Sequence, residues 1–291
     1  MKSENLSDVI TDLQQLQRQR RMLLGTRIKL ENRFYAIVAV NELGYEPVQN
    51  EKDRDGIRKK AEAYVKSVLA GEQETSILSF IQTSHDSVQT FAIQCDIIEK
   101  AMEKRASDLP IADWIEEPDQ KGVSFLSLAK IIGEAGDLSN YPKVYLLWKR
   151  FGLTPIINDG HTRAASWWSR NKKRLSADQW IRAGYSPRRR SICFVISENL
   201  VRQNGSGPYR VRYDEAKRIF IEKHADEIAE DEGRDQKQKV CPPMRAHRHA
   251  MGMAVKLLLK RLWMQWTGRT EESRDPDGLK EVLTAVEASQ R

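Results

Sequence analysis

Residues 122–155 read GVSFLSLAKIIGEAGDLSNYPKVYLLWKRFGLTP and carry the pattern that decides the fold of this chain. Gly122, Val123 and Ser124 form a small-residue turn, and an apolar run at helical spacing follows it directly. The turn Gly136-Asp137 separates this run from a second short amphipathic segment. A turn that leads into a helix N-terminus directs unpaired backbone N–H groups outward, which suits a phosphate group. The stretch therefore predicts a helix-hairpin-helix module, with Gly122, Val123 and Ser124 as nucleic-acid contacts.

The composition indicates a soluble, helix-rich protein of one large or two small domains: 291 residues, 40% hydrophobic and 31% charged. No apolar run approaches the roughly 20 residues that a membrane helix needs. The N-terminus, MKSENLSDVI, lacks the apolar core of a signal peptide. Cys95, Cys193 and Cys241 are scattered and odd in number, which favours a reducing cytoplasm. We expect a cytoplasmic, nucleoid-associated protein with no membrane partner and no cofactor.

The net charge of +7 is unevenly distributed along the chain. Residues 1–120 carry 16 Lys and Arg against 21 Asp and Glu, whereas residues 121–270 carry 29 against 14. Within 141–213 the ratio is 15 to 3. An ordinary solvated face mixes both signs, so this block predicts a surface for a polyanion. Nucleic acid is favoured over lipid because the tryptophans of the block lie among polar, turn-like residues rather than along one helical stripe.

Seven basic side chains of this block are the candidate nucleic-acid contacts: Arg163, Lys172, Lys173, Arg174, Arg188, Arg189 and Arg190. Ser186-Pro187 is a typical helix start, which places the last three in the first helical turn. The helix dipole disfavours cations there, so phosphate groups are the expected counter-charge. The expected ligand is double-stranded DNA or a DNA junction, with structured RNA as a further candidate.

Two heptad patterns precede this region, and alternating steps of four and three residues are the condition for a coiled coil. The first comprises Val9, Leu13, Leu16, Arg20, Leu23, Arg27, Leu30, Phe34 and Ile37; the second comprises Ile77, Ile81, Ser84, Val88, Phe91, Cys95, Ile98 and Met102. A shorter helix, about 55–70, lies between them and is closed by Gly71. These patterns predict a helical hairpin, which pairs within the chain or across a homodimer. Arg20 and Arg27 argue against a plain self-pairing zipper, because buried like charges repel.

The fold expected from these patterns is all-α, in three parts. Residues 1–108 form the coiled-coil hairpin, residues 109–268 form the helix-hairpin-helix type domain, and residues 269–291 form a polar tail. A connector rich in proline and acidic residues marks the boundary near 108–120. From Pro242 a basic amphipathic helix is expected, with an apolar face of Met251, Val255, Leu258, Leu259, Leu262 and Trp263 or Trp266.

The pattern in residues 122–155 resembles the C-terminal helix-hairpin-helix domain of bacterial insertion-sequence transposases and invertases of the serine/DEDD type. The positions in register are Gly122, Ala129, Glu134, Gly136, Asp137, Leu138, Tyr141, Trp148, Gly152, Leu153 and Pro155. Residues 184–192 and 256–263 are similar to later motifs of that domain, and the hairpin matches the family's dimer-forming linker in kind. The resemblance implies a DNA-binding protein of transposase ancestry that forms a homodimer through its coiled coil.

Two departures from that family bear on catalysis. The RuvC-like domain with four metal-binding acidic residues is expected ahead of the coiled coil, and residues 1–70 show only helical patterns. The family's serine nucleophile is expected about four residues after the proline of G-L-x-P, where Asp159 stands. Ser166 is the remaining candidate for a displaced nucleophile. We therefore expect binding without autonomous catalysis, the alternative being an active recombinase subunit that works with a separate nuclease chain.

No metal site is expected from the sequence. Cys241, His247 and His249 are the nearest approach to a metal cluster, but His-x-His on a helix points its two side chains in different directions. Asp137 is better interpreted as a helix cap than as a metal ligand. A helical interaction scaffold with an incidental basic face stays open as a third possibility.

Overall fold

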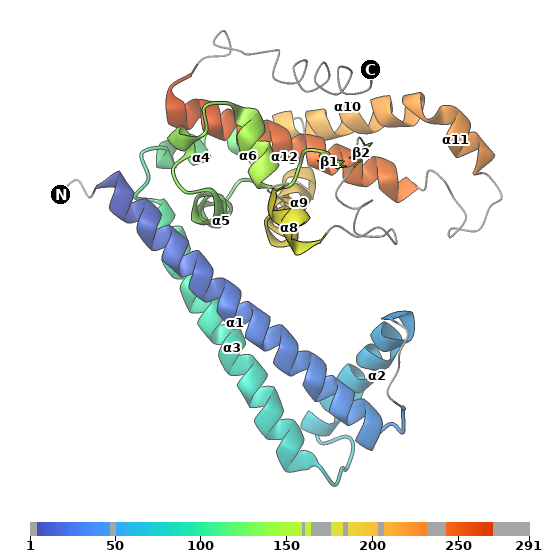
Figure 1. The fold of residues 1–291 in the computed structure, drawn as a ribbon. Coiled ribbons are helices and arrows are strands. Elements are labelled where there is room, and N and C mark those ends of the chain that lie inside the picture. The colour runs from blue at the N-terminus through green and yellow to red at the C-terminus, as the bar shows by residue number, and fades with distance from the viewer. Residues whose placement is uncertain are drawn as a thin grey trace. The chain divides into compact units, whose positions relative to one another are not determined.

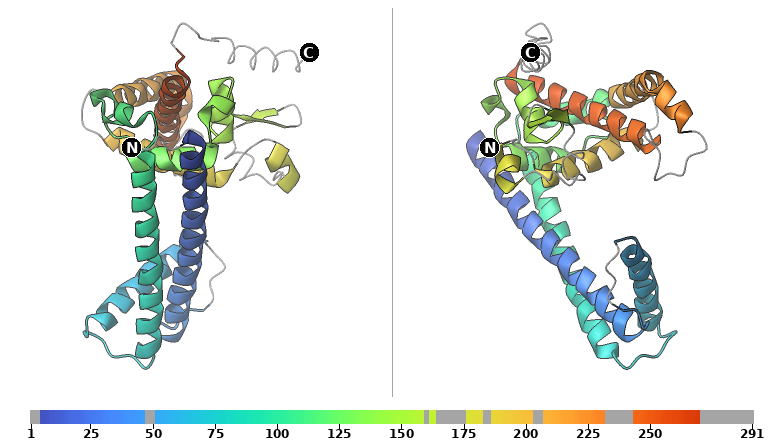
Figure 2. Two further views of the ribbon diagram at one scale, coloured as in Figure 1. Left: turned by 90° about the vertical axis from the view of Figure 1, so that its left-hand side faces the viewer. Right: turned by 45° about the vertical axis from the view of Figure 1, so that its right-hand side comes forward.

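The computed structural model describes residues 5–46, 51–158, 161–163, 176–182, 186–202, 207–231 and 243–269. Helix dominates this part of the chain, which confirms the all-α expectation of a helical hairpin followed by a helical domain (Figure 1, Figure 2). The helices are α1 (Leu6–Asn41), α2 (Glu51–Leu69), α3 (Leu78–Ala106), α4 (Ala112–Glu116), α5 (Phe125–Ala135), α6 (Val144–Arg150), α8 (Ala177–Arg182), α9 (Pro187–Arg202), α10 (Pro208–Lys223), α11 (Ala225–Glu230) and α12 (Pro243–Thr267). Two 3-10 turns, η1 (Pro118–Gln120) and η2 (Leu138–Asn140), flank α5.

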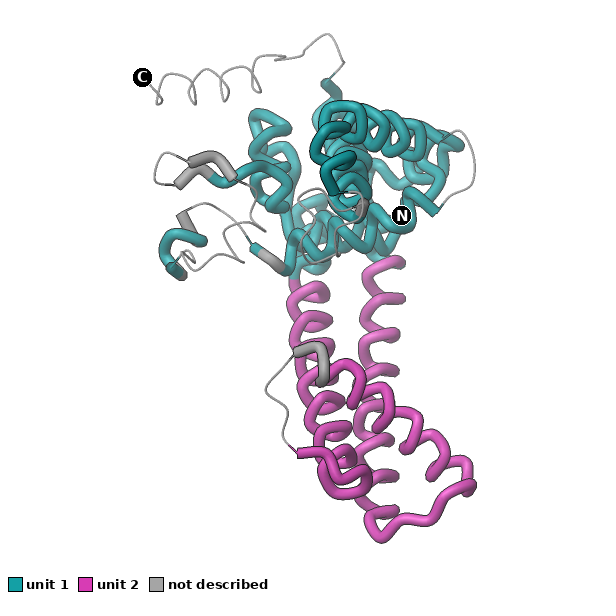
Figure 3. Tube along the Cα trace, turned by 90° about the vertical axis from the view of Figure 1, so that its right-hand side faces the viewer, with its two compact units in different colours: residues 1–14, 104–291 teal, residues 15–103 magenta. Residues whose placement is uncertain are grey.

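The chain divides into two compact units (Figure 3). Unit 1 comprises residues 1–14 and 104–291, and unit 2 comprises residues 15–103. The point where unit 2 ends and unit 1 resumes, between Glu103 and Lys104, lies a few residues before the expected boundary near 108–120. The first turns of α1 group with unit 1, although their heptad pattern continues into unit 2. The expected polar tail lies, after Arg269, outside the described residues.

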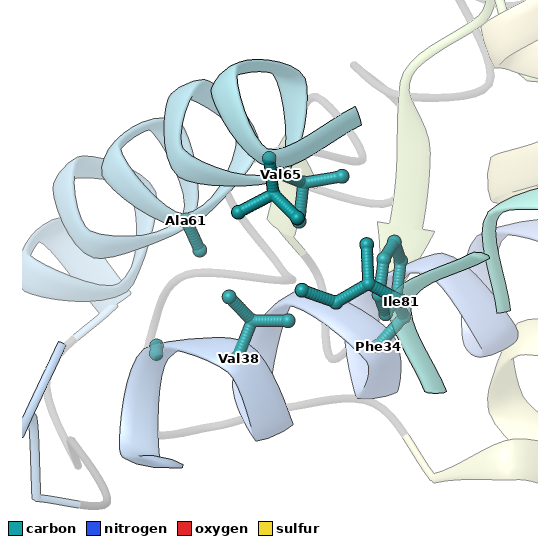
Figure 4. Packing of buried hydrophobic residues seen from close by; sticks show 7 residues of the cluster. Phe34, Val38, Ala61, Val65 and Ile81 are labelled. Atoms are coloured by element: carbon teal, nitrogen blue, oxygen red, sulfur yellow. The ribbon is translucent and has the colours of Figure 1, made fainter. Parts of the chain in front are cut away.

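Unit 2 is a helical hairpin with a third helix at its closed end. Helices α1 and α3 run antiparallel, and Arg20 of α1 forms an ion pair with Glu99 of α3. Near the turn, α2 packs on both helices through a buried apolar cluster (Figure 4): Phe34, Val38, Ala39, Ala61, Val65, Val68 and Ile81. Gly71 follows α2 with φ +76°, a conformation that glycine adopts without strain. The pairing within the chain uses the predicted heptads, and Arg20 is accommodated because it meets a carboxylate.

The heptad positions of α3 are all buried or half-buried, and so are those of α1 with the exception of Ile37. Leu16, Leu23 and Leu30 are only half-buried. At the end of α1 the expected position Ile37 is 41% exposed, and the adjacent Val38 is fully buried. The prediction of Ile37 as a seam residue was wrong. The reason is α2: Ala61 and Val65 approach α1 from the side of Val38, so the buried face turns toward the third helix.

In unit 1, α12 is the central element. It packs on α9, α10 and α6, and its predicted apolar face is buried from Met251 to Trp263. Three indole N–H groups fix α12 to residues 137–148. Trp148 donates to the Lys256 carbonyl (3.1 Å), Trp263 to the Tyr141 carbonyl (2.8 Å) and Trp266 to Asp137 Oδ1 (2.9 Å). The expected amphipathic helix is thus confirmed, and tryptophan side chains anchor it.

One local element departs from the all-α expectation. Strands β1 (Ile156–Asn158) and β2 (His161–Arg163) pair antiparallel, with Ile156 opposite Arg163 and Asn158 opposite His161. The sequence Asp159-Gly160 between them is a favoured two-residue hairpin connection, because both positions tolerate positive φ. The all-α expectation contained no strand in this segment.

Candidate nucleic-acid interface

The turn before α5 was the first predicted phosphate contact, and protein groups already occupy part of it. Gly122 has φ +96°, so the turn depends on glycine. The Val123 N–H donates to the Gln120 carbonyl (2.9 Å), and the Ser124 hydroxyl accepts from the Ser127 N–H (3.1 Å). Ser124 is therefore the N-cap of α5, which leaves fewer N–H groups for a phosphate.

The residues in register with the transposase pattern have packing roles in this fold. Ala129 and Leu138 are fully buried, and Trp148 anchors α12. Gly136 has φ +77° and ends α5, where a Cβ would lie 2.9 Å from Gln14 Nε2. The presence of these four residues is accounted for by their contribution to the packing of unit 1, independently of any ligand.

Asp137 caps η2, as the sequence predicted. Its Oδ1 accepts from the Ser139 N–H (2.9 Å) and the Ser139 hydroxyl (2.7 Å), as well as from Trp266. Burial acts to raise the pKa of Asp137, but these hydrogen bonds outweigh it and leave the pKa below its ordinary value. Asp137 is an ionised capping residue that links η2 to α12.

The three predicted arginines at the start of α9 fall into different environments. Arg188 is exposed and Arg190 is half-buried. Arg189 Nε forms an ion pair with Glu134 Oε2 at 3.2 Å, and the Glu134 side chain is only 4% exposed. Glu134 already supplies the counter-charge of Arg189, so its main contact is internal. Helix α9 begins at Pro187, as predicted.

Helices α9, α10 and α12 form the most basic layer of the described structure. Together they contain 14 Lys and Arg against 4 Asp and Glu, and α12 contains no acidic residue. The three acidic residues of α10 each pair with an arginine of the same helix, in the pairs Arg210–Asp214, Arg212–Glu215 and Arg218–Glu222. Three further arginines pair with acids of neighbouring elements, in the pairs Arg189–Glu134, Arg245–Glu227 and Arg261–Asp119. The layer still contains more cations than these acids neutralise, which is the electrostatic character of a phosphate-binding surface.

The histidines of this layer have partners within the protein. Tyr213 Oη lies 2.7 Å from His247 Nδ1, and the rings of His224 and His249 lie 4.3 and 5.0 Å from that of Phe220. Burial lowers the pKa of His249, and nearby cations, with Lys256 the strongest, lower it further. Among the described residues no group of three or more His, Cys, Asp or Glu has the geometry of a metal site. Cys241 lies outside that part of the chain.

Several predicted contacts cannot be placed. Lys172, Lys173, Arg174 and the candidate nucleophile Ser166 lie outside the described residues, and the side chain of Arg163 is not described. Conversely, the cations of α10 and α12 were not among the predicted contacts. The sequence of α12 could have indicated its cations as contacts, because its 25 residues include five Lys and Arg and no acidic residue.

Comparison with protein-family models, with curated proteins and with solved structures finds no match to this chain. Within the described ranges, none of the helices combines the length and apolarity that a bilayer crossing demands.

Proposed function

We propose that this chain is a DNA-binding protein that contacts phosphates through the basic layer of α9, α10 and α12. The observation that carries the proposal is the charge of that layer, in which acidic residues are few and mostly paired internally. Arg188 at the start of α9 is exposed and sits where the helix dipole disfavours a cation, so a phosphate would relieve a local conflict.

Transposase ancestry is part of the proposal and is supported by the ordered resemblance in residues 122–155 alone. Because those residues also have packing roles, the resemblance bears on descent and fold more than on chemistry. We accordingly propose binding without autonomous strand transfer. The alternative, a recombinase subunit with a separate nuclease chain, predicts that Mg²⁺ and that partner together produce nicked duplex.

The test is duplex affinity as a function of salt, measured by fluorescence anisotropy on the full chain. If about six phosphates are neutralised, log affinity falls with log salt at a slope near −5. Arg188→Gln weakens binding to every duplex to a similar extent and reduces the slope by about one, because a phosphate contact carries no sequence information. The matched control is Arg58→Gln, since Arg58 of α2 is 42% exposed and belongs to unit 2. A salt-independent affinity would contradict the proposal.

We also propose that unit 2 associates with a second copy of the chain. The central part of the hairpin leaves large apolar side chains exposed, with Met22 and Ile28 on α1 and Ile93 and Ile97 on α3. The two helices also differ in charge: residues 18–33 contain six Lys and Arg and one acid, whereas residues 81–99 contain three acids and neither Lys nor Arg. Two hairpins packed with α1 of one copy against α3 of the other match opposite charges in a four-helix arrangement.

A further inference from the structure

One half-buried phenylalanine of unit 1 is surrounded by ionisable side chains. The ring centroid of Phe220 on α10 lies 4.3 Å from that of His224, at the end of the same helix, and 5.0 Å from that of His249 on α12. The interplanar angles are 32° and 38°, so the rings pack face to face in a tilted arrangement. The Arg245 guanidinium also lies over Phe220, with Cζ 5.7 Å from the ring centroid. These contacts bring three rings and one guanidinium together in one cluster.

A hydrogen bond and an ion pair hold this cluster in place. His224 Nδ1 lies 2.9 Å from Glu227 Oε1, and Oε2 of the same carboxylate pairs with Arg245 at 3.2 Å. Glu227 belongs to α11, so the cluster joins three helices. A binding surface whose side chains are already fixed loses less conformational entropy when a ligand arrives.

His249 is the ring of the cluster that is most open to solvent. The residue is exposed, whereas Phe220 and His224 are half-buried. Since Phe220 covers one face of the imidazole, the opposite face is open to a further planar group. Partial burial lowers the pKa of His249, and the charge of Lys256 lowers it further, so the ring is neutral near pH 7. A neutral imidazole offers a π-face to a planar, uncharged ligand.

Cations border the cluster on two helices. Arg248 is exposed next to His249 on α12, and Lys223 is exposed in the last turn of α10. The carboxylate of Glu227 is already shared by His224 and Arg245. An aromatic surface bordered by cations suits an unpaired nucleobase, because the base stacks on the ring and the cations contact the phosphates on either side of it.

We propose that the cluster of Phe220, His224 and His249 binds one unpaired base of DNA, which stacks on the exposed face of His249. Arg248 and Lys223 contact the phosphates that flank this base. A base inside an uninterrupted duplex is stacked between its neighbours and cannot reach the imidazole, so the ligand is DNA with a junction, a bulge or a single-stranded end. The inference rests on the proposed function and deepens it, because it selects the kind of DNA that unit 1 prefers.

The test compares duplexes of one sequence by fluorescence anisotropy on the full chain. A single unpaired adenine is expected to increase the affinity about tenfold over the fully paired duplex, through stacking of that base on the imidazole. The slope of log affinity against log salt is the same for both duplexes, because stacking releases no counterions. A third duplex carries an abasic residue in place of the unpaired adenine. It keeps the interrupted backbone without a base to stack, so we expect it to bind like the paired duplex.

Variants of the cluster assign the preference to its rings. His249→Ala reduces the preference to less than about twofold, and His249→Phe retains it because an aromatic face remains. Phe220→Leu keeps an apolar side chain beside His249 but removes the ring, and it weakens the preference roughly threefold or more. The matched control is His85→Ala, because the His85 side chain on α3 is 35% exposed and belongs to unit 2. The control leaves the preference unchanged. The measured quantity is a ratio of two affinities, so a uniform loss of folded protein does not alter it.

The outcomes separate the stacking site from the proposed function. Equal affinity of the native chain for the paired duplex and the adenine bulge, with salt dependence retained, would keep the function and remove the stacking site. An abasic bulge bound as tightly as the adenine bulge, or an undiminished preference in His249→Ala, would also overturn the stacking site. Absence of binding to all three duplexes would contradict both proposals.

Discussion

Asp137 shows how one residue of the family-like pattern stabilises unit 1. Its Oδ1 accepts from the Ser139 N–H, the Ser139 hydroxyl and Trp266 Nε1, all within 2.9 Å. Hydrogen bonds to an ionised carboxylate are stronger than those to its neutral form, and they tie η2 to the last turns of α12. The capping role follows from the Gly-Asp turn in the sequence, but the contact with Trp266, 129 residues away, does not.

The lowered pKa of Asp137 gives its stabilisation a defined pH dependence. The ionised carboxylate contributes fully above the unfolded pKa of about 4, and the contribution is lost as the pH falls through the lower folded pKa. Asp137→Asn retains an acceptor oxygen but removes the charge. We expect it to lower the free energy of unfolding by about 1 kcal/mol at pH 6 and by nearly nothing at pH 2. Urea unfolding at a series of pH values measures this, and a pH-independent difference would contradict the assignment.

The Glu134–Arg189 pair is the second residue-scale test. Glu134→Gln leaves Arg189 half-buried without its counter-charge, and we expect a loss of about 3 kcal/mol in the free energy of unfolding. Glu134→Gln combined with Arg189→Met removes both charges, so most of the loss is recovered. The double-mutant cycle measures the coupling. Additive losses would show that the pair does not act as a unit. The sequence could not reveal this pair, because its members are 55 residues apart and meet only through the packing of α5 on α9.

At the scale of elements, the periodicity of apolar residues in the sequence predicted where the helices lie, but not which elements they pack against. The heptads of α1 and α3, the start of α9 at Pro187 and the apolar face of α12 were all predictable from local pattern. The burial of Val38 in place of Ile37 could not be predicted from local pattern, because it depends on where α2 packs. Likewise, the basic block predicted a charged surface, but which arginines are paired internally depends on long-range contacts.

Two adjacent residues of α1 provide a matched test of which side chain belongs to the buried face. Val38 is fully buried in the cluster shared with α2, and Ile37 is 41% exposed. We expect Val38→Ala to lower the free energy of unfolding by about 2 kcal/mol and Ile37→Ala to lower it by less than about 0.5 kcal/mol. Chemical denaturation of the full chain, followed by circular dichroism, compares the two. Equal losses in the free energy of unfolding for the two variants would show that Ile37 belongs to the buried face as well.

At the scale of the whole molecule, net charge is confined to one unit. Residues 15–103 contain 13 Lys and Arg and 13 Asp and Glu, so unit 2 is neutral and the entire +7 belongs to the rest of the chain. A neutral unit contributes little to attraction toward a polyanion. This distribution of charge supports the proposal that unit 1, and not unit 2, contacts a polyanion.

The proposed association of unit 2 is tested on two strongly exposed apolar residues of α3. Ile93 and Ile97 are 59% and 61% exposed and lie one helical turn apart on α3, so replacing them by lysine costs the monomer little. In the proposed four-helix dimer both positions are buried against the basic α1 of the other copy, so two added ammonium groups oppose assembly by desolvation and by like-charge repulsion. We expect sedimentation equilibrium to give a dimer for the native chain and a monomer for Ile93→Lys/Ile97→Lys, with unchanged helical content. The matched control is Ile219→Lys on α10, because Ile219 is 45% exposed and belongs to unit 1. The control variant is expected to remain dimeric. Equal dimer dissociation constants for the native chain, the α3 double variant and the control would show that the dimer interface does not include this face of the hairpin.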